Sequence, residues 1–489
     1  MSISSPSTER RPSAEALLSN FSLEMQRLRS NDSDIKTPAN ISNALPASTD
    51  DGPSGSRDAH DHAEYRVYKR RFFGLLQLVL LNIAVSWDWL TFAAVSDTSA
   101  SYFGVSQSAI NWLSTGFLFA FVAASPFTIW TLNKRGPKGA IVVAAVLILV
   151  GNWIRYIGTR VSAGTYGAVL FGQIIIGFAQ PFVLSAPTRY SDLWFSDKGR
   201  VSATALASLA NPLGGALGQL IGPLWATDES GIPAMILYTA IISSIASLPS
   251  FFIPSHPPTP PSASSAQPKL ELRHSFHTLS TNTSFYLIFL PFSVYVGFFN
   301  ASSSLLNQIL SPYGFSEDEA GIAGGIMIVV GLVAAAIISP IIDRTKHYLF
   351  FIKILVPLIA IGYLILIFAP ATRTVGAPYF ICALLGASSF SLLPCALEYL
   401  VEVTHPVSPE ITSTICWAGG QLLGAVFIIV MDALKGGWKN EPKDSMTRAL
   451  VFEAVVSWAV VPCALALGWW GRAGVRLGRR DVEVGEDGD

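Results

Sequence analysis

The chain has 489 residues, of which 51% are hydrophobic and only 13% are charged, and its formal net charge is −1. Soluble proteins carry about 25% charged residues, so this composition excludes an ordinary soluble globular protein and favours one that crosses a membrane several times. The near-zero net charge also provides no overall field that would attract nucleic acid.

Long apolar runs alternate with short polar segments along the chain. Residues 1–68 form a polar leader without hydrophobic periodicity, which we expect to be disordered. Six apolar runs follow, each long enough to cross a bilayer as a helix, at residues 72–95, 109–132, 138–158, 166–187, 201–225 and 232–253. After a Pro/Ser-rich linker, six more runs and a polar tail complete the chain. The linker covers 254–283, the runs cover 284–306, 318–342, 348–369, 377–400, 411–433 and 448–470, and the tail covers 471–489.

Six spans, a hydrophilic linker and six further spans are typical of the major facilitator superfamily. We therefore expect an all-α integral membrane protein with twelve transmembrane helices in two six-helix bundles, at 69–253 and 284–470. Most basic residues between the runs fall on one side, which the positive-inside rule assigns to the cytosol together with both termini. The loop that holds Lys435, Lys439 and Lys443 is the exception.

Two short loops resemble each other and the cytosolic loop pattern D-R-x-G-R-K of the superfamily. The first, "LNKRGPKG", follows the second run and has Lys134 where arginine is usual. The second, "IIDRTKH", follows the eighth run, and its Asp343 and Arg344 match the pattern. The resemblance implies a gating role, in which charges and helix-end contacts close the cytosolic side. The alternative is a basic anchor at the membrane surface.

A few charged residues lie within the apolar runs: Asp88, Arg155, Glu398 and Glu402. A charge in the bilayer core costs several kcal/mol, so it faces a cavity or a partner. Asp88 and Arg155 could pair with each other, or Asp88 could balance the charge of a bound solute while Arg155 takes part in coupling. Uncharged Gln180 either hydrogen-bonds between helices or lines a cavity.

Trp89 lies well inside the first apolar run, beside Asp88, and Phe92 shares its helix face. An aromatic wall near a carboxylate provides the chemistry for recognising a quaternary ammonium group. We interpret Trp89 as part of a cavity wall. The alternative is a tryptophan at the membrane interface, where this residue type is common.

The string "CALEYLVEVTHPVSPE" carries two acids four residues apart, Glu398 and Glu402, which therefore share a helix face. Glu402 is near the cytosolic end of its run, so we assign it a gating role. Glu398 is deeper and would titrate when buried, which suits proton coupling. Structural pairing of Glu398 is the alternative.

Motifs of catalysis are absent from the sequence, which contains no nucleophile elbow, no phosphate-binding loop and no run of metal ligands. We therefore expect a protein that is not an enzyme and that needs neither a cofactor nor a metal. The four cysteines lie in apolar stretches without CxxC spacing, and we interpret them as small buried hydrophobic residues.

Five strings together resemble solute carrier family 49, the feline leukaemia virus subgroup C receptor-related branch of the superfamily, and most closely its major facilitator domain-containing members. They are "SWDWLTFAAVSDTSASYFGVSQSAINWLS", "AQPFVLSAPTRYSDLWFSDKGRVSATALASLANPLG", "SSLLNQIL", "IIDRTKH" and "LEYLVEVTHPVSPE". The resemblance implies transport of choline and ethanolamine, with haem export by some members. It also implies a choline cavity that contains Trp89, Gln180 and Gln421.

One position departs from the family pattern. The tyrosine of the family's cavity is replaced here by Asn300, which removes one wall of an aromatic cage. The aromatic residues that could compensate are Tyr295, Phe298, Phe299 and Trp417.

We predict a secondary transporter that moves a small organic solute by alternating access, with a choline-like organic cation as the favoured substrate. The alternatives are a haem or porphyrin exporter and a membrane receptor or sensor that binds without transporting. We expect a monomer that contacts membrane lipid and has no nucleic-acid partner. Both the plasma membrane and a vacuolar or other organelle membrane are open as its location.

Overall fold

A computed structural model describes residues 66–161, 165–259, 279–345, 347–404, 407, 409–436 and 441–468. Most of the expected leader and linker and the whole of the expected tail therefore lie outside the described residues. Every regular element in these ranges is a helix. The longer helices are α2 (Arg71–Leu90), α4 (Gln107–Arg160), α5 (Tyr166–Leu184), α7 (Asp197–Trp225), α8 (Ile232–Ser247), α11 (Thr283–Leu310), α12 (Glu317–Thr345), α13 (Tyr348–Leu366), α14 (Gly376–Thr404), α15 (Pro409–Ala433) and α16 (Thr447–Ala459).

The helices match the expected spans, although their number depends on how one element is divided. Among the described residues, ten helices are long and apolar enough to cross a membrane. One of them, α4, has 54 residues and is broken at Gly136, where φ is 67° and ψ is −174°. Only glycine adopts this conformation readily, and Pro137 then starts the second arm. The two arms of α4 hold the second and third expected spans.

The fifth expected span coincides with α7, which has 29 residues but is not among the ten apolar candidates. Its glycines, prolines, Asn211 and Gln219 lower its hydropathy. With α7 and both arms of α4, each of the twelve expected spans overlaps a described helix. The prediction of an all-helical membrane fold is confirmed.

The first expected span, 72–95, is shorter in the structure. The helix α2 ends at Leu90, a turn covers residues 91–95, and the short helix α3 (Ser96–Phe103) follows. The hydroxyl of Thr91 donates to the carbonyl of Trp87 at 2.9 Å, a local bond that favours the end of a helix. Gly104, with a φ of 63°, then ends α3.

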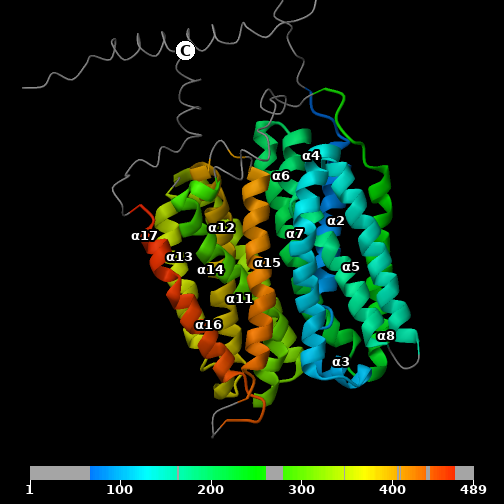
Figure 1. Cartoon of the computed structure of the whole chain (residues 1–489), viewed down its shortest axis with the longest axis vertical. Helices are drawn as coiled ribbons and strands as arrows, with labels where there is room; N and C mark the ends of the chain where they lie inside the picture. Colours follow the sequence, from blue (N-terminus) through cyan, green and yellow to red (C-terminus); the bar gives the residue numbers. More distant parts are fainter. Residues whose placement is uncertain are drawn as a thin grey trace, which may run out of the picture. The chain divides into compact units, whose positions relative to one another are not determined.

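Helices of the first half pack against helices of the second half in the middle of the assembly. Figure 1 shows α2, α5 and α8 on one side and α12, α13, α14 and α16 on the other, and α15 lies against α4 as α12 lies against α7. We call the two groups, α2–α8 and α11–α17, the N bundle and the C bundle; the short helix α17 covers Val461–Ala466. The short helix α6 (Ala186–Trp194) marks one end of the helices and α3 marks the other, and we call them the α6 end and the α3 end.

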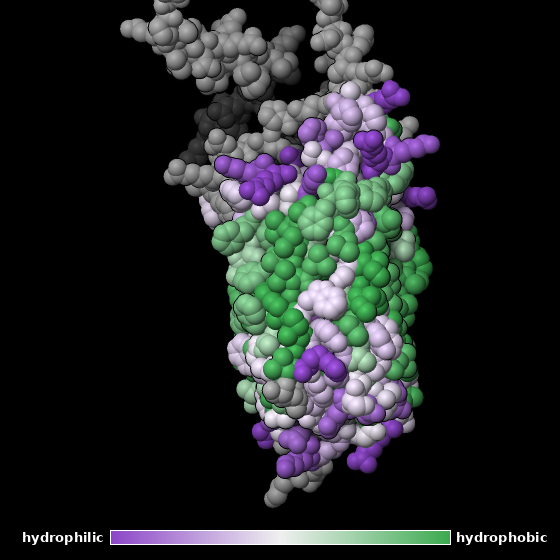
Figure 2. All heavy atoms as spheres, turned by 90° about the vertical axis from the view of Figure 1, so that its right-hand side faces the viewer, coloured by the Kyte–Doolittle hydropathy of each residue, from purple (hydrophilic) through white to green (hydrophobic). Residues whose placement is uncertain are grey.

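An apolar belt surrounds the helices. Figure 2 shows a broad hydrophobic band between hydrophilic residues at both ends. Large apolar side chains such as Phe127, Phe171 and Ile245 are exposed at 67%, 58% and 68%. A multi-pass membrane protein exposes such side chains to lipid, so the belt fits a bilayer.

The four cysteines are free thiols, and Cys382, Cys395 and Cys416 are buried. This agrees with their interpretation as small hydrophobic residues.

Candidate functional site

Trp89 lies at the C-terminal end of α2 and is only 5% exposed. Its indole stacks on the ring of Phe117 in α4, with 6.4 Å between the ring centroids. The indole nitrogen Nε1 is buried and has no hydrogen-bond partner within the described residues. A buried donor without a partner is costly, and a ligand can supply the missing acceptor.

Gln180 in α5 belongs to the same neighbourhood. It is 2% exposed, and its Oε1 atom is buried without a hydrogen-bond partner in the described part of the chain. One helical turn earlier, a Cβ atom on Gly177 would lie 2.6 Å from the carbonyl oxygen of Phe117. The helix α5 therefore contacts α4 directly beside the residue on which Trp89 stacks.

The C bundle contributes Asn300 from α11 and Gln421 from α15. The Nδ2 atom of Asn300 donates to Oε1 of Gln421 at 2.9 Å, and both side chains are buried. A Cβ atom on Gly424 would lie 3.0 Å from Cβ of Asn300 and 3.3 Å from Cδ1 of Leu118. Leu118 follows Phe117 in α4, so this amide pair meets the N bundle at the same level of α4 as the Trp89 stack. We group Trp89, Gln180, Asn300 and Gln421 as a candidate central site, called the central site below.

Asp88 is not part of the central site. It is completely buried inside the N bundle, with Oδ1 lying 3.3 Å from Nη1 of Arg155. Its Oδ2 accepts hydrogen bonds from Asn152 at 2.6 Å and from Ser243 at 3.3 Å. Successive residues of a helix point about 100° apart, so the side chains of Asp88 and Trp89 face different neighbours. The structure thus shows the ion pair with Arg155, and we remove Asp88 from the substrate-binding set.

The aromatic residues near Asn300 in the sequence make contacts with other helices of the C bundle. Phe299 packs edge-on against Phe390 of α14, with ring centroids 5.2 Å apart. The hydroxyl of Tyr295 donates to the carbonyl of Ser457 at 2.9 Å, inside the C bundle. Tyr295 therefore does not replace the missing phenol, and Phe299 lies at a contact with α14.

Phe298 and Trp417 also pack within the C bundle. Phe298 stacks on Phe427 at 4.1 Å, and Trp417 lies edge-on to Phe292 at 5.8 Å. None of these ring contacts involves the hydrogen-bonded amides of Asn300 and Gln421.

The residues assigned to gating fall into three groups. Lys134 and Arg344 are exposed at the α6 end, whereas the side chain of Asp343 lies outside the description. Glu402 is partly buried, and its Oε2 has no hydrogen-bond partner within the described residues. The expected burial of Glu398 is wrong: its side chain is exposed, because α14 turns its neighbour Tyr399 inward instead.

A polar network at the α3 end connects the bundles and was missed by sequence reasoning. Glu317, the first residue of α12, accepts hydrogen bonds from the backbone N–H groups of Asp97 at 2.9 Å and Thr98 at 3.2 Å. It also accepts from the hydroxyl of Thr98 at 2.7 Å. Asn307 of α11 donates to Glu317 at 3.1 Å and to the hydroxyl of Ser96 at 3.0 Å. These contacts join α3 to α11 and α12.

A second set of contacts extends this network to α4 and α15. Gln308 donates to Oδ1 of Asn111 at 2.6 Å, and Asn111 donates to Asp432 at 2.9 Å. Lys435 donates to Gln107, which in turn donates to Asp97. The α3 end is therefore closed by polar bonds between the bundles. We call both sets together the α3-end network.

Asp97 is an acid of this network that lies outside the spans. Burial raises the pKa of its carboxyl above the ordinary value of 3.8, while the charge of Lys435 and hydrogen bonds from Ser311 and Asn307 oppose this. Lys435 lies in the loop that departs from the one-sided distribution of basic residues, and it interacts with Asp97 at the α3 end. The sequence offered two signals of this network: the basic residues of that loop, and the adjacent polar residues Asn307 and Gln308 at the end of an apolar run.

Three comparisons relate the chain to known proteins. A family model described as Major Facilitator Superfamily matches residues 78–428. The chain is 30% identical over 413 residues to Solute carrier family 49 member A3 of Danio rerio, covering 83% of this chain and 86% of the relative. It is 27% identical over 448 residues to the choline/ethanolamine transporter FLVCR1 of Mus musculus, covering 85% and 78%.

The fold is shared with solved transporters. A crystal structure of a D-xylose-proton symporter matches with a TM-score of 0.63 and 16% identity, covering 82% of this chain and 97% of that chain. At this identity, the match shows the fold alone.

Proposed function

We propose that this protein, which belongs to the major facilitator superfamily and within it to solute carrier family 49, moves a choline-like organic cation through its central site. Transport across a membrane by alternating access follows from the family. What we add to the family assignment is the substrate class, which is supported by the chemistry of Trp89, Gln180, Asn300 and Gln421.

The proposal rests on two buried polar atoms in the N-bundle half of the central site that have no hydrogen-bond partner among the described residues. Nε1 of Trp89 is a donor and Oε1 of Gln180 is an acceptor, and both are buried. A hydroxyl group can accept from the first and donate to the second. The indole ring attracts an ammonium group by cation–π interaction. An amino alcohol carries both of these groups on one small molecule.

The α3-end network provides one gate of the transport cycle. In the arrangement described, it bonds α3 and α4 to α11, α12 and α15, so a solute cannot leave at this end without breaking it. The positive-inside rule places the α6 end, with Lys134 and Arg344, in the cytosol. We assign the loops around these two residues to the opposite gate, and both termini to the cytosol. Because one chain supplies both halves of the central site, a monomer suffices.

Radiolabelled choline flux into proteoliposomes tests the proposal. Cation–π attraction in a desolvated site is worth about 2 kcal/mol, so Trp89→Ala should lower saturable flux by about tenfold or more. Trp112→Ala is the matched control, because Trp112 is 47% exposed on the outer face of α4. The control should keep its flux.

Two results would contradict the proposal. One is absence of saturable choline flux in folded, reconstituted protein. The other is equal flux in Trp89→Ala and Trp112→Ala. If the protein bound a porphyrin instead of choline, the larger substrate class would replace the organic cation.

A further inference from the structure

Glu453 is a second fully buried acid, on the inner face of α16 in the C bundle. Its Oε1 accepts a hydrogen bond from the hydroxyl of Ser302 in α11. Its Oε2 is buried and has no hydrogen-bond partner among the described residues. The sequence analysis passed over this residue, and the central site does not use it.

The groups that face Glu453 are neutral. They are Tyr363 from α13 and Cys382 from α14, while Tyr295 from α11 lies close by with its hydroxyl bonded to Ser457. Arg448 lies on α16 itself, but its side chain is exposed. Within the described residues, no basic side chain forms an ion pair with Glu453.

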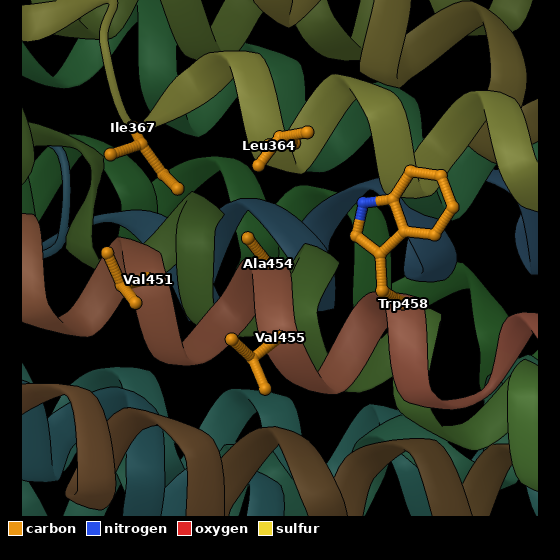
Figure 3. A pocket seen from close by; sticks show the side chains of 6 residues that line it. All are labelled: Leu364, Ile367, Val451, Ala454, Val455 and Trp458. Atoms are coloured by element: carbon orange, nitrogen blue, oxygen red, sulfur yellow. The ribbon is translucent and has the colours of Figure 1, made fainter.

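The outer face of α16 is apolar as well. Together with the end of α13, it lines a groove of about 410 Å³ (Figure 3), formed by Leu364, Ile367, Val451, Ala454, Val455 and Trp458. The ring and aliphatic side chains of this groove offer no charge to the buried acid. An ionised carboxylate in such surroundings costs so much free energy that the group takes up a proton instead.

We propose that Glu453 is a proton-binding site that is occupied in the arrangement described and that couples proton binding to the movement of α11. The proton resides on Oε2, and Oε1 remains the acceptor for Ser302. When water reaches the site, the O–H bond of the carboxyl breaks, the proton passes to water, and the carboxylate stays on Glu453. No oxidation or further bond change is involved.

The helix α11 supplies the mechanical connection. Asn300 bonds Gln421 in the central site, Ser302 bonds Glu453, and Asn307 belongs to the α3-end network. In this proposal, α11 slides relative to α16 when the α3 end opens, which moves Ser302 away from Glu453 and changes the bond from Tyr295 to Ser457. By reciprocity, a proton on Glu453 and the closed α3 end favour each other. The coupling to solute movement rests on the proposed function, whereas the proton occupancy of Glu453 does not.

Infrared spectroscopy of the purified full chain tests the occupancy directly. At neutral pH, the wild type should show a carbonyl stretching band from a protonated carboxyl group, and Glu453→Gln should lose that band. Asp318→Asn is the control, since Asp318 is an exposed acid, and it should keep the band. A band unchanged in Glu453→Gln would overturn the proposal.

Flux measured against pH tests the coupling. The wild type should change its flux with pH, and Glu453→Gln, which mimics the protonated acid, should transport without that dependence. In case Glu453→Gln does not fold, a second pair serves the same purpose. Ser302→Ala should move the midpoint of the pH profile, and Ser303→Ala should not, because the Ser303 hydroxyl makes no hydrogen bond to Glu453 or to any other described residue.

The two proposals fail separately. Wild-type protein that shows the band without choline flux contradicts the choline proposal and keeps the proton site. Saturable choline flux with no dependence on pH, or with the same dependence in Glu453→Gln, overturns the coupling and keeps the choline proposal.

Discussion

Among the described residues, each bundle buries one acid completely, and the two acids are neutralised in different ways. Asp88 in the N bundle lies 3.3 Å from Arg155. Glu453 in the C bundle has no basic neighbour among the described residues and accepts from the hydroxyl of Ser302. The charge on Asp88 is balanced by a cation of the protein, whereas an acid that depends on a proton changes its charge when the proton leaves. The two bundles therefore use an internal ion pair in one case and a bound proton in the other.

The two halves also exchange the positions of the acid and the serine. In the N bundle, the acid is on the first helix and Ser243 is on α8; in the C bundle, Ser302 is on the first helix and the acid is on α16. The first helix α2 is thus fixed by a charge, through Asp88 and Arg155. The first helix α11 is attached to α16 by hydrogen bonds without an ion pair, from Ser302 to Glu453 and from Tyr295 to Ser457, so it is the better candidate for the moving element.

The largest expected effect comes from removing the cation of the N bundle. Arg155→Met leaves the carboxyl of Asp88 buried without its cation, so folding must either desolvate the charge or take up a proton, and the free energy of unfolding should fall by about 3–5 kcal/mol. Glu453→Gln replaces a neutral carboxyl by a neutral amide of similar shape, so it should cost less than about 1 kcal/mol. Thermal unfolding in detergent at neutral pH measures both changes.

The double variant Asp88→Asn with Arg155→Met is the control, because it removes both charges. It should be more stable than Arg155→Met alone. If Arg155→Met and Glu453→Gln were equally destabilised, the distinction between the paired acid and the protonated acid would be lost.

The sequence predicted the helices well because the apolar runs are long and almost free of charge. The sequence also identified Asp88 and Trp89 as residues of interest. It does not show that these two adjacent side chains of one helix lie in different environments. The i,i+4 spacing of Glu398 and Glu402 identified a shared face without telling which face α14 buries. Glu453 was missed because it stands alone in an apolar run, where only the packing of the neighbouring helices reveals its lack of a cation.

The α3-end network was beyond sequence reasoning for a related reason. It joins Asp97, Asn111, Asn307, Glu317 and Lys435, which lie in five separate segments of the chain. Each residue alone looks like an ordinary polar side chain at the end of a span. The hydrogen bonds among these residues form because the two bundles contact each other at the α3 end.

A middle-sized effect is expected when α11 loses its anchor at this end. Asn307→Ala removes hydrogen bonds to Ser96 and Glu317, each worth about 0.5–1.5 kcal/mol. The population closed at the α3 end should fall, and the change is measurable as a longer distance between spin labels on α3 and α12. Ser304→Ala is the control on the same helix, because the Ser304 hydroxyl is buried without a hydrogen-bond partner in the described residues. Equal distances in both variants would show that Asn307 does not hold the gate.

The smallest expected effect is the contribution of Asp97 to the pH dependence of closure at the α3 end. Burial in the closed network raises the pKa of Asp97 above 3.8, and opening to water returns it towards that value. The closed state therefore binds more protons than the open state, so closure of the α3 end weakens as the pH rises through the raised pKa of Asp97. Because Lys435 and two hydrogen bonds oppose the shift, the effect should be the smallest of these effects. Spin-label distances across the α3 end, recorded against pH, measure it.

Protonation of either Asp97 or Glu453 is expected to favour the closed α3 end. The variants Asp97→Asn and Glu453→Gln each remove one of these acids and so separate the two contributions. Asp97→Asn should remove only the acidic part of the pH dependence, where an exposed carboxyl begins to titrate. Glu453→Gln should remove the part that depends on the buried acid of α16, which has no basic partner among the described residues. A pH response that survived in Glu453→Gln and vanished in Asp97→Asn would assign the switch to the α3-end network, and Glu453 would then not be the proton-dependent contact.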